Sequence, residues 1–392
     1  MNCITIKSIV IGLMLTALSV LPLKAQTPAA EHPDDYIPML KNKNIGLVAN
    51  HSSRVGEKRL LDALIENGIS VLKIYSPEHG FRGTATEGEA VNHSADEKTG
   101  ISIISLYGAN KKPTAKQLNG IDCMVFDMQD VGTRFYTYLS TMHYVMEACA
   151  ENNIPLIVLD RPNPNGFYID GPILEPAQKS FVGMHPIPIV HGMTLGELAQ
   201  MINGEGWLSD KLQCMLTVIT CKNYTHQSLY KLPVRPSPNL PNMTAVYLYP
   251  TLCLFEGTVL SVGRGAGFPF QVYGHPNYEE KKGYEFVFTP RGTKGSSKPV
   301  LDGKTCYGVD LRECNALEIT NGQIQLDWII DAYKNFSPQD KFFSKFFDTL
   351  SGNTLLRRQI ENGKTAGEIR KSWKKGLDNF KQSRKKYLLY DE

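Results

Sequence analysis

Residues 71–83 read VLKIYSPEHGFRG. The run Val71–Tyr75 is apolar and rich in β-forming residues, so it predicts a short buried strand. Directly after it the chain places Glu78, His79 and Arg82 within five positions, beside Gly80 and Gly83, where the backbone can turn sharply. A strand that ends in ionisable groups and glycines is typical of a functional loop at the edge of a sheet.

The same alternation recurs through the first part of the chain. Further strands are expected at 44–49, 101–107, 123–128, 155–159 and 216–220, with helices at 57–67, 136–152 and 194–202. The last helix carries a capping box, with Thr194 as N-cap and Glu197 three residues later. Strands that alternate with helices predict an α/β fold with a Rossmann-like parallel sheet covered on both faces.

The pattern of residues along the chain changes near residue 232. Four prolines fall between residues 233 and 241, which indicates a hinge or linker. Beyond it we expect a helix near 244–254, glycine-rich turns from 257 to 274, strands at 284–288 and 307–311, and helices to residue 392. The prediction is a Rossmann-like domain at 34–232 and a smaller α+β domain at 233–392, with a cleft between them.

The first 25 residues resemble a secretory signal peptide. Lys7 precedes the apolar run 8–23, which is too short for a typical membrane span, and Ala25 offers a small residue for cleavage. An N-terminal membrane anchor is the alternative. The expected mature chain has no membrane span and is exported, to the periplasm or the medium.

Charge and cysteine content exclude some classes of protein. The formal net charge is only +3, which argues against a protein built to bind nucleic acid. A basic cluster at 370–386 is typical of a solvated helix, with contact to an anionic polymer as the lesser alternative. No CxxC pair is present, so a thiolate zinc site is not expected.

Polar residues follow nearly every expected strand. They are Asn50–Ser52, Glu78–His79, Asp127–Asp130 with Arg134, Asp160–Asn163, and His191 after the run 187–190. Parallel strands bring their carboxyl ends to one edge of a sheet, so these residues predict a polar cleft. Each also has a structural interpretation: an internal ion pair for Asp160 and Arg161, a helix cap for Asp127, and a buried structural role for His191.

The chemistry on offer suits glycoside hydrolysis. Glu78 can act as general acid, if its surroundings raise its pKa, and a second carboxylate or a group on the sugar can complete the reaction. The candidate partners are Asp127, Asp130, Asp160, Glu87 and Glu256. Aromatic residues for sugar contact include Phe81, Tyr107, Phe135, Tyr136, Phe268, Phe270 and Tyr273. Arginines that can grip a carboxylate are Arg82, Arg134, Arg161 and Arg264.

Six ordered motifs carry a family resemblance. They are SPEHGFRG (76–83), DMQDVGTRFYTY (127–138), LDRPNPNG (159–166), HGMTLGELA (191–199), PSPNLP (236–241) and FEGT with SVGRG (255–265). Together they resemble the secreted exo-acting N-acetylmuramidases, glycoside hydrolase family 171, long known only as a domain of unknown function. The resemblance spans the chain from Tyr36 onward.

The resemblance implies a function and a set of site residues. It implies release of N-acetylmuramic acid from the non-reducing ends of peptidoglycan fragments, with Glu78 as catalytic acid and no cofactor or metal. We assign Asp127 and Asp130 as further catalytic candidates. The expected substrate contacts are His79, Arg82, Arg134, Tyr136, Asp160, Arg161, Asn163, His191, Asn239, Glu256 and Arg264.

Two details of that assignment stay open. Arg264, or else Arg134, is expected to bind the lactyl carboxylate of the muramyl group. The second catalytic participant is either the substrate's acetamido group, oriented by Asp127 or Asp130, or a carboxylate that activates water. Many relatives carry Asn and Glu where this sequence has Val259 and Val262, so the fine specificity is expected to differ.

Two other classes of protein fit part of the pattern. An exported sugar- or muropeptide-binding protein would have the same two lobes and hinge but no turnover. A metal-dependent hydrolase would use scattered ligands such as His51, His79, Asp127 and Asp160.

Overall fold

The computed structural model describes residues 25–77, 80–81, 94–293 and 296–392. Residues 1–24 of the expected signal peptide therefore lie outside the described residues, and so do Glu78, His79, Arg82 and Glu87. We call the residues up to 232 the first half and residues 233–392 the second half.

A mostly parallel sheet forms the centre of the first half. Within the described residues its seven strands lie in the order β5-β6-β4-β1-β7-β8-β9, and only the short β5 runs antiparallel. Their bounds are β1 Asn44–Ala49, β4 Ser70–Ser76, β5 Ser94–Ala95, β6 Ser102–Ser105, β7 Cys123–Asp127, β8 Leu156–Leu159 and β9 Leu216–Ile219. The predicted α/β class is confirmed, because six expected apolar runs became neighbouring parallel strands.

The two faces of the sheet are covered differently. Ile45, Leu47 and Val125 belong to one core, with α1 (Pro33–Leu40) and α2 (Leu60–Glu66). Val48 and Phe126 belong to the other core, with α4 (Tyr138–Glu151) and α5 (Leu195–Gly204). This alternation follows from the period of two along a strand. The first half also contains β2 (Arg54–Val55), β3 (Lys58–Arg59) and α3 (Ala115–Leu118).

The second half combines a small antiparallel sheet with helices. Its strands lie in the order β10-β12-β11. The bounds are α6 Met243–Leu252, β10 Val272–His275, β11 Phe286–Phe288, β12 Cys306–Asp310, α7 Ala316–Thr320, α8 Leu326–Asn335, α9 Lys345–Ser351, α10 Leu355–Glu361 and α11 Ala366–Arg384. The α+β character is confirmed, but β10 lies inside the stretch expected to form only glycine-rich turns.

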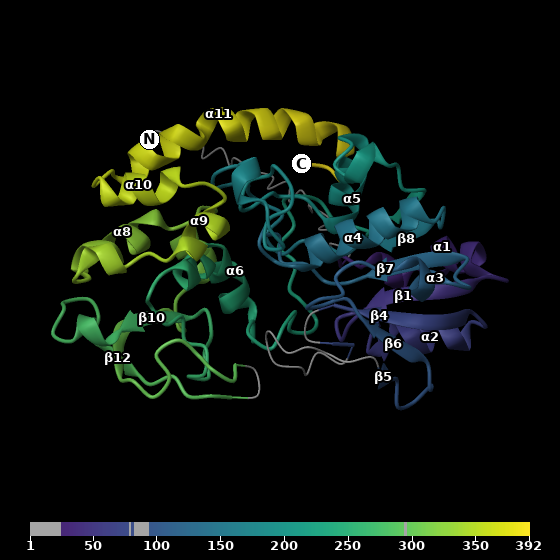
Figure 1. Cartoon of the computed structure of the whole chain (residues 1–392), viewed down its shortest axis with the longest axis horizontal. Coiled ribbons are helices and arrows are strands. Elements are labelled where there is room, and N and C mark those ends of the chain that lie inside the picture. The colour runs from purple at the N-terminus through teal and green to yellow at the C-terminus, as the bar shows by residue number, and fades with distance from the viewer. Residues whose placement is uncertain (1–24, 78–79, 82–93, 294–295) are drawn as a thin grey trace, which may run out of the picture.

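The two halves share one hydrophobic core, and the C-terminal end of the chain also packs against the first half. The core that contains Leu139 and Leu198 of the first half continues into Leu252 and Phe347 of the second. Figure 1 shows the second half on the left, the first half on the right, and α11 crossing above both. Beyond α11 the chain returns to the first half, where the Tyr390 hydroxyl donates to Asp160 and the Leu389 amide donates to Glu197.

Candidate active site

The stretch that opened the sequence analysis leaves the sheet at its carboxyl edge. After β4 ends at Ser76, the Gly80 amide donates to the Pro77 carbonyl at 3.1 Å, and Gly80 has a φ of +73°. Phe81 is buried in the core on the α1 and α2 side of the sheet. Pro77, Gly80 and Phe81 are thus the described residues nearest to Glu78, His79 and Arg82, which themselves lie outside the described residues.

Asp127 and Arg161 form a buried ion pair below this edge. Arg161 donates to both carboxylate oxygens of Asp127, with 2.8 Å between Nη2 and Oδ2, and also to the Arg54 carbonyl at 2.9 Å. Both side chains are almost completely excluded from solvent. The pair ties together the loops that follow β7 and β8. Both carboxylate oxygens of Asp127 thus accept from Arg161, and substrate contact by Arg161 stays a prediction.

Asp160 anchors the start of α5. Its carboxylate accepts from the Thr194 hydroxyl at 2.6 Å, from the Gly196 amide at 2.8 Å and from the Tyr390 hydroxyl at 2.6 Å. Burial raises the pKa of Asp160 to about 6, against the lowering effect of these hydrogen bonds. The expected capping box of Thr194 and Glu197 is confirmed. Asp160 thus has a structural role in the unliganded chain, and its assignment as a substrate contact stays a prediction.

Asn163 is also occupied within the protein. Its Nδ2 donates to the Met193 carbonyl at 2.9 Å, and its Oδ1 accepts from the Asn165 amide at 2.8 Å. Gly132, with a φ of +80°, passes so close that an added Cβ would lie 2.2 Å from Asn163 Oδ1. Asn163 therefore links the 160–165 loop to Met193 and packs against Gly132, and its assignment as a substrate contact stays a prediction.

Asp130 and His191 are also buried, and they lie close to each other. Asp130 Oδ2 accepts from the Gly132 amide at 2.6 Å, and burial raises the pKa of Asp130 to about 7. His191 Nδ1 accepts from the Met193 amide, and Nε2 lies 3.9 Å from Asp130 Oδ2. Burial, with the nearby Arg384, lowers the pKa of His191 to about 3. Val190, at the end of the run 187–190, makes isolated bridges to Thr133 and Asp170, and His191 is fully buried.

Arg134 connects the two halves of the molecule. Its guanidinium donates to the carbonyls of Pro172, Ile187, Leu350 and Ser351 at 2.7 to 3.0 Å. The side chain is only 1% exposed. The guanidinium is thus engaged within the protein, and substrate contact by Arg134 stays a prediction.

A cavity of about 380 Å³ lies where the two halves meet. Tyr107 follows β6, while Tyr136 and Tyr138 lie at the start of α4. The opposite wall comes from the linker, through Asn239, and from the second half. Among the described residues, the predicted substrate contacts that line the cavity are Tyr136, Asn239, Glu256 and Arg264. The volume falls within the range of small-ligand sites, roughly 300–1,000 Å³.

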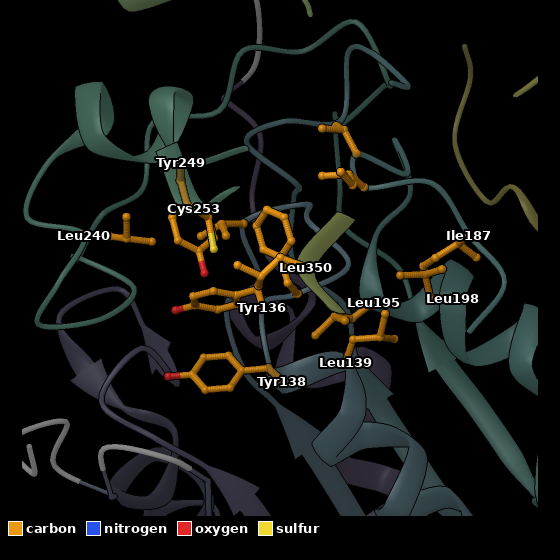
Figure 2. Close-up of a cluster of buried hydrophobic side chains, with 14 of the residues drawn as sticks. Tyr136, Tyr138, Leu139, Ile187, Leu195, Leu198, Leu240, Tyr249, Cys253 and Leu350 are labelled. Carbon is orange, nitrogen blue, oxygen red and sulfur yellow. The ribbon is translucent and has the colours of Figure 1, made fainter. Parts of the chain in front are cut away.

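Aromatic rings make up much of the cavity wall. Tyr249 makes edge-to-face contacts with Phe135 and with Phe270, at centroid distances of 5.4 and 4.8 Å. Tyr136 and Tyr138 lie 4.8 Å apart, and both hydroxyls donate to the Pro236 carbonyl. Figure 2 shows these two rings one above the other with their hydroxyl groups on the same side. The wall thus offers flat apolar surface of the kind that sugar rings contact.

Glu256 and Arg264 place opposite charges in this apolar wall. Arg264 Nε donates to Glu256 Oε1 at 2.6 Å, and the guanidinium lies 4.8 Å from the centre of the Phe270 ring. The side chains of Glu256 and Arg264 remain 21% and 14% exposed, so both can be reached from the cavity. Val262 also lines the cavity, whereas Val259 does not. Of the two positions where this sequence is expected to differ from many relatives, the one that lines the cavity is therefore Val262.

Sequence reasoning missed Tyr138 and Tyr249 as lining residues. Tyr138 stands in the quoted motif FYTY, two positions after Tyr136, which is the signal that could have identified it. Tyr249 lies inside an apolar helix, where nothing in its sequence context distinguishes it from a core residue. It reaches the cavity because α6 packs against the loop that follows β7.

Two further features concern metal ligands and membrane-spanning helices. Among the described residues, no group of three or more histidine, cysteine, aspartate or glutamate side chains is arranged to hold a metal ion. Within the same residues, no helix has both the length and the apolar character needed to cross a bilayer.

Comparison with known proteins matches most of the chain to one family. The family model for the exo-β-N-acetylmuramidase NamZ N-terminal domain matches residues 45–244, and the model for its C-terminal domain matches residues 247–390. The peptidoglycan β-N-acetylmuramidase NamZ of Bacillus subtilis (strain 168) is 41% identical over 390 residues, which cover 94% of this chain and 92% of the relative.

Two solved structures are similar in fold. Both are DUF1343 family proteins from Bacteroides fragilis NCTC 9343. One has a TM-score of 0.88 and 51% identity, and covers 94% of this chain and 100% of its own. The other has a TM-score of 0.79 and 29% identity, and covers 93% of this chain and 99% of its own.

Proposed function

The chain belongs to the exo-β-N-acetylmuramidase NamZ family, and on that premise we propose that it releases N-acetylmuramic acid from the non-reducing ends of peptidoglycan fragments. The chain is thus a glycoside hydrolase rather than a sugar receptor. The observation that carries the proposal is the aromatic cavity between the two halves, which holds a reachable ion pair.

Glu78 is the proposed general acid. Support comes from the position of its flanking residues, since β4 delivers Ser76 and Pro77 to the carboxyl edge of the sheet. The adjacent strand β6 leads at that same edge to Tyr107, which lines the cavity. An acid placed beside apolar aromatic rings has a raised pKa and can hold a proton for the leaving oxygen.

Arg264 is the proposed contact for the lactyl carboxylate. Of the two candidate arginines, Arg134 is committed to four carbonyls, whereas Arg264 lines the cavity. Glu256 holds Nε of Arg264 and so fixes the plane of the guanidinium. A fixed guanidinium plane favours recognition of a planar carboxylate.

The second catalytic participant is either the substrate's acetamido group or a water molecule activated by a carboxylate. Glu256 is the carboxylate that lines the cavity among the described residues, whereas Asp127 is paired with Arg161 below it. Asp130 remains a candidate for orienting the acetamido group through the 129–133 loop. The anomer released first separates the two routes: retention supports the acetamido route, and inversion supports activated water.

The proposed substrates are muramyl saccharides derived from peptidoglycan, and the proposed location is outside the cytoplasm. The substrate class follows from the name of the Bacillus subtilis relative. Export to the periplasm or the medium rests on the signal-like residues 1–25.

The deciding experiment follows release of N-acetylmuramic acid from a muramyl-terminated disaccharide. Glu78→Gln should lower kcat by about 10²–10⁴-fold while the disaccharide still binds. Glu57→Gln, at an exposed position in the β2–β3 turn, is the matched control and should keep full activity. Equal turnover by wild type and Glu78→Gln would remove Glu78 from the mechanism. Binding without turnover in the wild type would favour a receptor.

A further inference from the structure

A second hollow of about 380 Å³ lies away from the aromatic cavity. The loop 166–169, residues 226–227, the end of α11 and Glu392 surround it. It shares no lining residue with the first cavity among the described residues. Nothing in the proposed reaction uses it.

The end of α11 gives this hollow a positive charge. Lys381 and Lys385 both line it and are exposed, one helical turn apart. Arg384 lies between them and is only 6% exposed. Its Nη1 donates to the Gly192 carbonyl at 2.7 Å. In the described part of the chain, these three cations face the carboxylate of Glu392 around the hollow.

Two buried polar atoms of the lining residues lack a hydrogen-bond partner among the described residues. They are Nε of Arg384 and Nδ1 of His226. His226 is 2% exposed, and its Nε2 lies 3.0 Å from Glu197 Oε1. With the Nε2 proton donated to that carboxylate, Nδ1 is left as an acceptor. Buried polar atoms are nearly always paired. Both atoms are themselves covered by protein, so they are unsatisfied polar groups of residues at the edge of the hollow rather than groups in its open wall.

Glu392 shows which chemical group suits the arginine. Its carboxylate accepts a hydrogen bond from Arg384 Nη2, yet the side chain is 50% exposed. An exposed carboxylate on a buried guanidinium can be displaced by a carboxylate from outside at little cost, because one charged hydrogen bond replaces another.

The hollow also has an aromatic side. Phe167 and Tyr168 both line it, with their ring centroids 5.0 Å apart. Small-molecule sites typically combine apolar surface with a few convergent polar groups. Aromatic rings beside two exposed lysines and a guanidinium together suit a sugar that carries an acid.

We propose that this hollow is a second, non-catalytic site for a carboxylate-bearing saccharide, formed by Arg384, His226, Lys381, Lys385 and Phe167. The natural source of that saccharide rests on the proposed function, because muramyl residues carry a carboxylate on a hydroxylated ring. Such a site holds a second stretch of glycan while the aromatic cavity processes an end.

The test measures binding of N-acetylmuramic acid itself to the full chain by equilibrium dialysis. The wild type should bind two equivalents, and Lys381→Ala/Lys385→Ala should lose one, with binding there weakened at least about tenfold. Lys371→Ala/Lys375→Ala is the matched control, since it removes two exposed lysines one turn apart on the same helix that do not line the hollow. Glu392→Gln removes the competing carboxylate and should strengthen binding at this site several-fold.

Three results would overturn the proposal. One is that the wild type binds a single equivalent of N-acetylmuramic acid, and that Arg264→Ala abolishes this binding whereas Lys381→Ala/Lys385→Ala does not. Another is an equal loss in the control double variant, which would mean unspecific charge attraction. The third is equal competition by N-acetylglucosamine or by the acidic dipeptide alanyl-glutamate, because the site would then read the sugar or the carboxylate alone.

The measurements distinguish an error in the proposed second site from an error in the proposed function. Turnover of the soluble disaccharide should be unchanged in Lys381→Ala/Lys385→Ala. If the wild type shows no turnover at all yet binds two equivalents, the proposed reaction fails and the second site stands.

Discussion

The loops at the strand ends and the wall of the aromatic cavity use polar side chains in opposite ways. In the loops, Asp127, Asp160 and Asn163 bond to other parts of the chain and are at most 2% exposed. In the cavity wall, Glu256 and Arg264 bond to each other and remain within reach of a ligand. The difference teaches that a polar residue at a strand end can anchor the loop instead of facing the cavity.

The largest effect is expected from a substitution that removes an anchor in the loops at the strand ends. Asp127→Asn leaves the Arg161 guanidinium buried without its counter-charge, and we expect it to lower the free energy of unfolding by about 3–5 kcal/mol. Urea unfolding followed by circular dichroism measures this. Asp378→Asn, in an exposed ion pair with Lys374, is the control and should not shift the transition. A loss below about 1 kcal/mol in Asp127→Asn would contradict the anchoring role.

A pH-dependent effect is expected from Asp130. Because its pKa is raised to about 7 in the folded chain, the folded state holds this proton more tightly than the unfolded state does. Its contribution to stability is therefore full below about pH 4 and is lost as the pH rises to about 7, with a slope of at most about 1.4 kcal/mol per pH unit. His191 adds no charge in this range, since its pKa is lowered to about 3.

Asp130→Asn should remove this slope. The difference in unfolding free energy between wild type and variant, measured from about pH 4 to about pH 8, should shift steadily in favour of the variant. A difference that does not vary with pH would mean that Asp130 is ionised throughout.

The smallest effect is expected in the cavity wall, and on activity rather than stability. Arg264→Ala should raise KM for muramyl substrates about tenfold, or about 1.4 kcal/mol, and hardly change KM for glucosaminyl analogues. The melting temperature should stay close to that of the wild type because the side chain is partly exposed. An equal rise for both substrates would mean that Arg264 does not bind the lactyl carboxylate.

Most of the sheet could be predicted from sequence because its strands are short, apolar and separated by helices. The runs at 44–49, 71–75, 123–128 and 155–159 became β1, β4, β7 and β8 with shifts of at most one residue at either end. The strand β10 was missed because Val272–His275 contains a glycine and follows a glycine-rich stretch. Its identity comes from pairing with β12, which local sequence does not encode.

The candidate site was only partly predictable. Sequence placed charged residues at the correct edge of the sheet but could not say which of them pair with each other. Asp127 and Arg161 are 34 positions apart, and Arg134 bonds to carbonyls 216 and 217 positions away. Such partners are set by how the loops and the two halves meet. The alternative of an internal ion pair was closest for Arg161, although its partner is Asp127 rather than Asp160.

The return of the chain from α11 to the first half has a consequence for biosynthesis. Asp160 and Glu197 receive hydrogen bonds from Tyr390 and Leu389, and Arg384 binds the Gly192 carbonyl. During translation the first half emerges from the ribosome long before these residues do. The nascent first half therefore emerges without these three bonds, and they form among the last events in making the molecule.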